Sequence, residues 1–167
     1  MFKEIKATDI KENIIDMISR EWMLITAGNK SGYNMMTASW GFMGEMWGNH
    51  SVSVMVRPQR YTMEFIEKSD YFTLSFYGDN KAIHKVCGNL SGRDVNKTEM
   101  AKLTPDFCEK APFFCEARLV IICKKQYVAP LDKCAFTDKE PLSKWYGGGM
   151  HVNVIGKIEK VLIKNEV

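Results

Sequence analysis

Residues 71–77 read YFTLSFY, and this stretch is the clearest indication of the fold class. Apolar side chains alternate in it with hydroxyl-bearing ones, and a period of two is what a β-strand with two distinct faces produces. Residues 51–56, SVSVMV, repeat the alternation. Two longer segments, 117–128 and 152–163, are rich in β-branched residues and are expected to be extended, the second with a bulge or bend at Gly156. The chain is therefore expected to be mainly β.

The segments around these strands favour short helices. A further short strand is predicted at 23–27, where an apolar run is closed by a Gly-Asn turn. Because no regular strand–helix–strand alternation appears, the pattern argues against a doubly wound parallel sheet. We expect an antiparallel barrel or sandwich with peripheral helices. From apolar spacing and capping residues, helices are predicted over about 9–18, 62–68, 80–86 and 94–103.

Length and composition fit one domain. The chain has 167 residues, of which 46% are hydrophobic and 26% charged, and these fractions exclude a disordered chain. No Pro- or Ser-rich linker divides it, so residues 1–167 are expected to form a single domain. The longest apolar run is too short to span a membrane, and the first residues carry no apolar signal region. A cytoplasmic protein without membrane contact is therefore expected.

Charge, cysteine and histidine content disfavour several kinds of site. A net charge of +3 is too small to argue for nucleic acid by itself. The five cysteines form no CxxC pair and are odd in number, so reduced thiols are expected rather than a disulfide framework. The three histidines are widely separated and no Cys/His cluster occurs, so no metal site is expected.

Two segments in the first half of the chain could carry chemistry. NMMTASW, at 34–40, is either an ordinary half-buried strand or a binding edge. VRPQRYT, at 56–62, brings Arg57, Arg60 and the capping hydroxyl of Thr62 to the start of a predicted helix. Free amides at a helix start, beside guanidinium groups, form an anion-binding site.

A third such segment, CGNLSGRDVNK at 87–97, combines glycines with polar and cationic side chains. Gly88 and Gly92 permit close approach of the backbone to a ligand. The spacing of a Walker phosphate loop is absent, and a plain glycine-containing turn remains an alternative. Cys87 is the only cysteine in the three segments, and we expect it to pack as a small apolar residue rather than react.

Taken together with FTLSFY at 72–77 and KWYGGGMHVNVIGKIE at 144–159, the three segments resemble the flavin reductase-like family, which has an FMN-binding split-barrel fold. The similarity is greatest to small flavoredoxin-type proteins and extends from about residue 22 to 163. The order and spacing of the blocks carry the resemblance. The stretch from 108 to 142 is the least family-like, and no site residue is assigned there.

The resemblance implies a six-stranded antiparallel split β-barrel with short peripheral helices, forming a homodimer that holds FMN near the subunit interface. Segment 34–40 would line the isoalloxazine ring, segment 57–62 would hold the phosphate, and loop 87–97 would close over both. The residues near 145–151 would lie by the ring or its substrate face. The implied cofactor-binding residues are Asn34, Met36, Thr37, Ala38, Ser39, Trp40, Arg57, Arg60, Tyr61, Thr62, Cys87, Gly88, Ser91, Gly92, Arg93, Lys97, Trp145, Tyr146 and His151.

The function implied by the resemblance is that of an FMN-dependent oxidoreductase. Such a protein either reduces flavin with NAD(P)H or passes electrons to a protein partner as a flavoredoxin does, and no nicotinamide fingerprint in the sequence decides between these. No catalytic acid or base is assigned, because the cofactor supplies the chemistry. Two alternatives are a non-catalytic FMN-binding module and a nucleic-acid-binding barrel. The second is disfavoured by the modest charge and by the usual core role of alternating aromatic residues.

Overall fold

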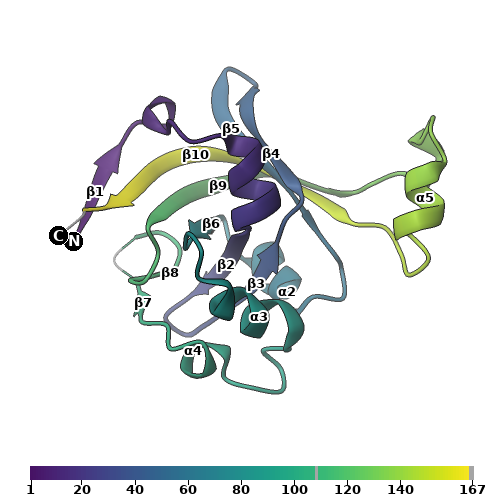
Figure 1. Ribbon diagram of the computed structural model, residues 1–167. Coiled ribbons are helices and arrows are strands. Elements are labelled where there is room, and N and C mark those ends of the chain that lie inside the picture. Colours follow the sequence, from purple (N-terminus) through teal and green to yellow (C-terminus); the bar gives the residue numbers. More distant parts are fainter. Residues whose placement is uncertain (108, 166–167) are drawn as a thin grey trace.

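The predicted strands pair into one antiparallel sheet in the computed structural model, which describes residues 1–107 and 109–165. The strand order is β3-β2-β6-β9-β10-β5-β4, and β1 pairs with β10. Figure 1 shows the two longest strands, β9 and β10, running side by side across the molecule. The strands are β1 Phe2–Ile5, β2 Met23–Asn29, β3 Gly32–Ala38, β4 Gly41–Met46, β5 Asn49–Val56, β6 Tyr71–Phe76, β7 Pro105–Asp106, β8 Phe113–Phe114, β9 Leu119–Pro130 and β10 Val152–Lys164.

The helices are short and peripheral, as the sequence predicted. Figure 1 shows α3 and α4 beside β3, and α5 on an arm that lies far from the two chain termini. Within the described residues no helix has the length and apolar character needed to cross a membrane. The helices are α1 Ile14–Asp16, α2 Tyr61–Lys68, α3 Lys81–Asn89, α4 Lys97–Met100 and α5 Glu140–Trp145, with a π-helical turn η2 at Met17–Glu21 and 3-10 turns η1 at Ala7–Asp9 and η3 at Lys133–Ala135.

The strand count exceeds the six that the family resemblance implied, although the mainly β, antiparallel class is confirmed. The described residues form ten strands, of which β7 and β8 make a separate two-stranded sheet. Strand β10 has thirteen residues, which is long enough for two strands to pair one after the other along the same side. Strand β5 pairs with β10 along 152–157, and β1 pairs with it along 161–164. The extra strands therefore extend the sheet without changing its topology class.

Both faces of strand β6 are buried. Phe72, Leu74 and Phe76 lie in the main apolar core, as their spacing predicted. Thr73 and Ser75 point to the opposite face and are also fully buried, because further parts of the chain cover that face. The Thr73 hydroxyl donates a hydrogen bond of 2.8 Å to the carbonyl of residue 112. A second core therefore forms outside the barrel, between the sheet and helix α3.

The position of Gly156 confirms the expected irregularity in the last strand. The pairing of β10 with β9 shifts register between residues 155 and 156. A Cβ atom at Gly156 would lie 2.7 Å from the ring of Phe72 and 3.0 Å from the Cβ of Cys123. Glycine is needed here because the Phe72 ring packs directly on the bent backbone.

Helix boundaries differ from the sequence prediction in several segments. The helix expected over 94–103 is limited to α4, and α3 extends three residues beyond the predicted end at 86. The segment expected to be one helix over 9–18 contains three short turns instead, ending in the π-helical turn η2. Helix α2 begins one residue before Thr62, with Arg60 at the N-cap and no side-chain cap. The Thr62 hydroxyl lies instead in the interior, where it accepts a hydrogen bond of 2.9 Å from Nδ2 of Asn34. The Thr62 hydroxyl, which local capping rules would place at the helix end, is thus bonded to the distant residue Asn34 instead.

Candidate functional site

A cavity of about 730 Å³ lies where edge strand β3, helix α3 and the arm that carries α5 come together. Strand β3 pairs only with β2, so half of its backbone groups have no ladder partner and face outward. The cavity therefore has a strand edge on one side and a helix on the other. Its lining residues are Trp22, Met36, Thr37, Ala38, Ser39, Trp40, Met55, Arg57, Arg60, Lys81, Ala82, His84, Lys85, Gly88, Asn89, Trp145 and His151.

The cavity is cationic. Arg57, Arg60, Lys81 and Lys85 line it, and no carboxylate stands among the described residues of its wall. The Arg57 guanidinium donates to the carbonyl of Trp145 at 3.0 Å, and that of Arg60 donates to the carbonyl of Gly88 at 2.8 Å. Burial, followed by the neighbouring Arg57, lowers the pKa of Arg60. Two guanidinium groups without a counter-charge form a binding site for an anion.

Aromatic rings form a part of the wall next to Arg57. The Trp40 ring lies 5.2 Å from that of Trp145, nearly perpendicular to it, and 4.8 Å from the His151 ring. Burial and the nearby Arg57 lower the pKa of His151, which favours the neutral form of this ring. Flat apolar surfaces beside a localised positive charge suit a planar ligand that carries an anionic group.

Trp22 enters the cavity wall from an unusual backbone position. It follows the π-helical turn with a φ of +70°, a value that few residues other than glycine adopt. Its backbone N–H donates to the carbonyl of Met17 at 3.0 Å, and its indole N–H donates to the carbonyl of Ser19 at 3.0 Å. The Lys81 ammonium lies 4.3 Å from the centre of its ring. These contacts hold the indole in place at the cavity.

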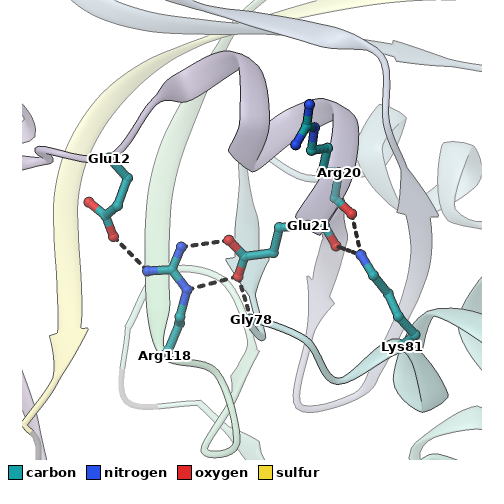
Figure 2. Close-up of polar contacts among 6 residues, drawn as sticks. All are labelled: Glu12, Arg20, Glu21, Gly78, Lys81 and Arg118. Carbon is teal, nitrogen blue, oxygen red and sulfur yellow. Dashed lines mark hydrogen bonds and ion pairs between the residues drawn. The ribbon is translucent and has the colours of Figure 1, made fainter.

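An ion-pair cluster anchors the residue that precedes Trp22. Figure 2 shows the Glu21 carboxylate between the Arg118 guanidinium and the backbone N–H of Gly78. The two Arg118 contacts, at 2.8 and 2.5 Å, are bidentate. Lys81 donates to the carbonyls of Arg20 and Glu21, the last residues of the π-helical turn. The cluster ties this turn to the residue before β9, to the loop before α3 and to the first residue of α3, and so fixes the position of Trp22 at the cavity.

One wall of the cavity contains a buried histidine. His84 projects from α3, is only 2% exposed, and has its Nδ1 atom 3.1 Å from the hydroxyl oxygen of Thr37 on β3. Burial, and then the positive charge of Lys81, lower the pKa of His84 to about 4. The imidazole is therefore neutral over the whole physiological range of pH.

The structure brings ten of the predicted site residues into this wall. They come from three segments that are far apart in the sequence and from helix α3, and the sheet places them around one space. Their contact with a cofactor remains a prediction. The ten residues are Met36, Thr37, Ala38, Ser39, Trp40, Arg57, Arg60, Gly88, Trp145 and His151.

Asn34, Thr62 and the residues near them lie behind the wall rather than on it. A Cβ atom at Gly92 would stand 2.2 Å from Oδ1 of Asn34 and 3.3 Å from the Tyr61 ring, so the loop 87–97 packs closely here. Arg93 pairs with Glu64 and lies over Tyr61, with its guanidinium carbon 4.5 Å from the ring centre. The hydroxyl of Ser91 accepts a hydrogen bond of 3.2 Å from the Arg93 backbone N–H.

Lys97 and Cys87 are buried at the base of the same loop. The Lys97 ammonium donates to the carbonyl of Met35 and, at 3.5 Å, to that of Cys87, and burial lowers its pKa to about 8. The Cys87 thiol is fully buried, and burial raises its pKa to about 11. This environment agrees with the expected packing role of Cys87, because the reactive thiolate form is suppressed. Tyr146 lines a neighbouring cavity instead.

Sequence reasoning missed seven residues of the wall. Five of them lie on helix α3, and four of these fall within the helix predicted over 80–86. Nothing in the sequence shows which helix face meets the cavity, and no local pattern marks the other two, Trp22 and Met55. The missed residues are Trp22, Met55, Lys81, Ala82, His84, Lys85 and Asn89.

A second cavity, of about 620 Å³, adjoins the first and shares Ser39, Trp40, Met55 and Trp145 with it. Its wall is apolar, and the large side chains of Ile15 and Phe42 that contribute to it are 75% and 70% exposed. No group of three or more potential metal ligands occurs in the described part of the chain.

Comparison with known proteins gives a match to one family model over most of the chain. Residues 16–167 match the model of a family described as flavin reductase like domain. No significant match is found among curated proteins.

Several solved structures share the fold. A flavoredoxin from Methanosarcina acetivorans is 20% identical, with a TM-score of 0.66 over 87% of this chain and 69% of that chain. An FMN-binding domain of a flavin reductases-like enzyme from Shewanella baltica OS155 is 14% identical, with a TM-score of 0.68 over 98% and 77%. An NADH:FAD oxidoreductase from Streptomyces globisporus C-1027 is 14% identical, with a TM-score of 0.64 over 86% and 75%.

Proposed function

Because the chain belongs to the flavin reductase-like family, we propose that it binds FMN in the 730 Å³ cavity and acts as a flavin-dependent oxidoreductase. The observation that carries the proposal is the combination of flat aromatic walls with two guanidinium groups that have no carboxylate opposite them in the described wall. A planar ring system joined to a phosphate has the matching chemistry.

The residues present fit such a cofactor. Arg57 and Arg60 would hold the phosphate, because each has N–H donors left after its one contact with a backbone carbonyl. Trp40 and Trp145, which contact each other, would pack against the ring and exclude water from it. Ser91, Arg93 and Lys97 are proposed as further phosphate contacts on the family resemblance alone.

The cofactor, when bound, supplies the ability to accept and release electrons, and the protein supplies position and environment. The side chains of the wall would bind the phosphate, hold the ring in the cavity and shield it from water. We assign no acid or base to the chain, because the redox chemistry belongs to the cofactor.

FMN is preferred over FAD because the paired arginines form one cationic centre, which suits a single phosphate group. The related structures include both an FMN-binding domain and an NADH:FAD oxidoreductase, so the choice needs a direct test. Isothermal titration with FMN, FAD and riboflavin provides it. We expect the tightest binding for FMN, and riboflavin binding as tight as FMN would contradict the assignment of the arginines.

The electron donor distinguishes a reductase from an electron carrier or a passive binding module. Rapid bleaching of bound flavin by NADH or NADPH, without oxygen, would identify a nicotinamide-dependent reductase. The same experiment on a passive module would leave the flavin oxidised. We propose the reductase activity first, because a cavity lined by the positively charged Lys81 and Lys85 also suits a phosphorylated electron donor.

We also propose that the protein is a homodimer in which a second copy covers the apolar cavity beside the site. Ile15, Phe42 and Trp145 line that cavity and are 75%, 70% and 46% exposed. An exposed apolar surface of this kind marks an interface. The substitution Phe42→Glu should shift the protein to monomers in sedimentation velocity experiments. A wild-type monomer at micromolar concentration that still binds FMN tightly would contradict the dimer.

A further inference from the structure

His84 is a buried histidine in the cavity wall to which the proposed function gives no role. Its Nδ1 atom lies 3.1 Å from the Thr37 hydroxyl oxygen, and the same oxygen lies 3.3 Å from the backbone carbonyl oxygen of His84. Its Nε2 atom is buried and has no hydrogen-bond partner among the described residues. The arrangement joins helix α3 to the outer face of edge strand β3.

Counting protons fixes the tautomer of this ring. The Thr37 hydroxyl has one proton, so it can donate to only one of its two neighbours. Both contacts are hydrogen bonds only if Nδ1 carries the ring proton and donates it to Thr37, while Thr37 donates to the carbonyl. With the proton on Nε2, Thr37 could make only one of the two contacts, whereas Nε2 lacks a partner in either form. The geometry therefore selects the neutral Nδ1–H form.

This form leaves the Thr37 hydroxyl with capacity for a ligand. One lone pair receives the imidazole proton, and the other is free. The hydroxyl donates its proton to the His84 carbonyl at 3.3 Å, which is a long hydrogen bond. That carbonyl is also a normal acceptor within the helix. Because a hydroxyl both donates and accepts, Thr37 can pair with a ring nitrogen whether or not that nitrogen carries a proton.

The hydroxyl is also held firmly in place. A Cβ atom at Gly88 would lie 3.3 Å from the Cβ of Thr37, so helix and strand are already in close contact one turn beyond His84. The His84 ring itself is packed edge-to-face against Trp22 and Tyr77, with ring centres 5.8 and 5.9 Å away. A side chain enclosed in this way keeps one rotamer.

We propose that His84 is a positioning residue, which donates from Nδ1 to Thr37 and so orients the Thr37 hydroxyl for a hydrogen bond to the polar edge of a flavin ring. The proposal rests on the proposed function for its ligand, but the His84–Thr37 contact can be tested without it. It assigns to Thr37 a contact with the ring rather than with the phosphate, so riboflavin and FMN should be affected equally.

The test compares four variants, with riboflavin and FMN titrated against each. Thr37→Val removes the hydroxyl at constant shape, and His84→Phe keeps a ring without a donor. His84→Asn keeps an N–H close to the position of Nδ1. Loss of one neutral hydrogen bond should weaken both ligands about two- to twelve-fold in Thr37→Val and His84→Phe. His84→Asn should retain wild-type affinity. The fourth variant, which combines Thr37→Val with His84→Phe, should bind no more weakly than Thr37→Val alone.

A second measurement uses the flavin-free protein. Nitrogen NMR of labelled imidazole reports which ring nitrogen carries the proton, and we expect Nδ1–H. An Nε2–H signal overturns the inference, as does equal weakening in His84→Asn and His84→Phe, or additive losses in the double variant. Wild-type protein that binds neither ligand would overturn the proposed function instead, and an Nδ1–H signal would then still uphold the hydrogen bond to Thr37.

Discussion

Replacing the cavity arginines should separate recognition of the phosphate from recognition of the ring. Arg57 and Arg60 each spend one N–H on a backbone carbonyl, at 3.0 and 2.8 Å, and each keeps several donors for a ligand. A hydrogen bond to a charged group contributes about 1.5–3 kcal/mol. Arg57→Ala or Arg60→Ala should therefore weaken FMN binding by about 10- to 150-fold.

Riboflavin, which lacks the phosphate, is the internal reference for this experiment. Arg60→Ala also removes the partner of the Gly88 carbonyl, and any resulting shift of helix α3 would weaken riboflavin and FMN alike. The ratio of the two dissociation constants isolates the phosphate contribution, and it can be measured by quenching of flavin fluorescence. Arg20→Ala is the matched control, because Arg20 is an exposed arginine that pairs with Asp16 outside the cavity. An equal loss for both ligands in the Arg57 and Arg60 variants would refute the reasoning.

Three further predictions concern the structure around the site. Gly92→Ala should lower the free energy of unfolding in urea by about 1–3 kcal/mol, because its Cβ would lie 2.2 Å from a buried oxygen; Gly148→Ala, which meets no atom, should not. Glu21→Gln should cost about 1–3 kcal/mol of stability and the more exposed Glu12→Gln less than about 1, and equal costs would contradict the anchoring role. Burial lowers the pKa of His84 from 6.5 to about 4, so between these pH values the unfolded chain binds a proton that the native protein does not. The free energy of unfolding should therefore fall by roughly 3 kcal/mol as the pH drops from 6.5 to about 4, and His84→Asn should abolish this loss.

The strands could be predicted from the sequence because their pattern is local. Alternation in 71–77 identified β6, and the isolated glycine at 156 marked the irregularity in β10. The helical segments were harder to define. The apolar spacing over 9–18 suggested one helix, but the chain there forms three short turns. Thr62 has the chemistry of a helix cap, yet a buried partner 28 residues away, Asn34, uses its hydroxyl.

The candidate site could be predicted only in part for a related reason. Segments 34–40 and 57–62 were recognisable as blocks, and the fold does bring residues from both to one cavity. His84 carries no local signal, because a histidine in a helical pattern does not reveal which strand the helix covers. Trp22 depends on a positive φ that no pattern announces. His84 and Trp22 can be assigned to the site only once the fold shows which distant segments lie side by side.

The most direct test of the proposed function is an anaerobic titration of the protein–FMN complex with NADH and NADPH, followed by visible absorbance. We expect a flavin spectrum that the enclosed site shifts from that of free FMN, and loss of the oxidised absorbance as one of the two nucleotides is added. A spectrum identical to free FMN that neither nucleotide bleaches would contradict it.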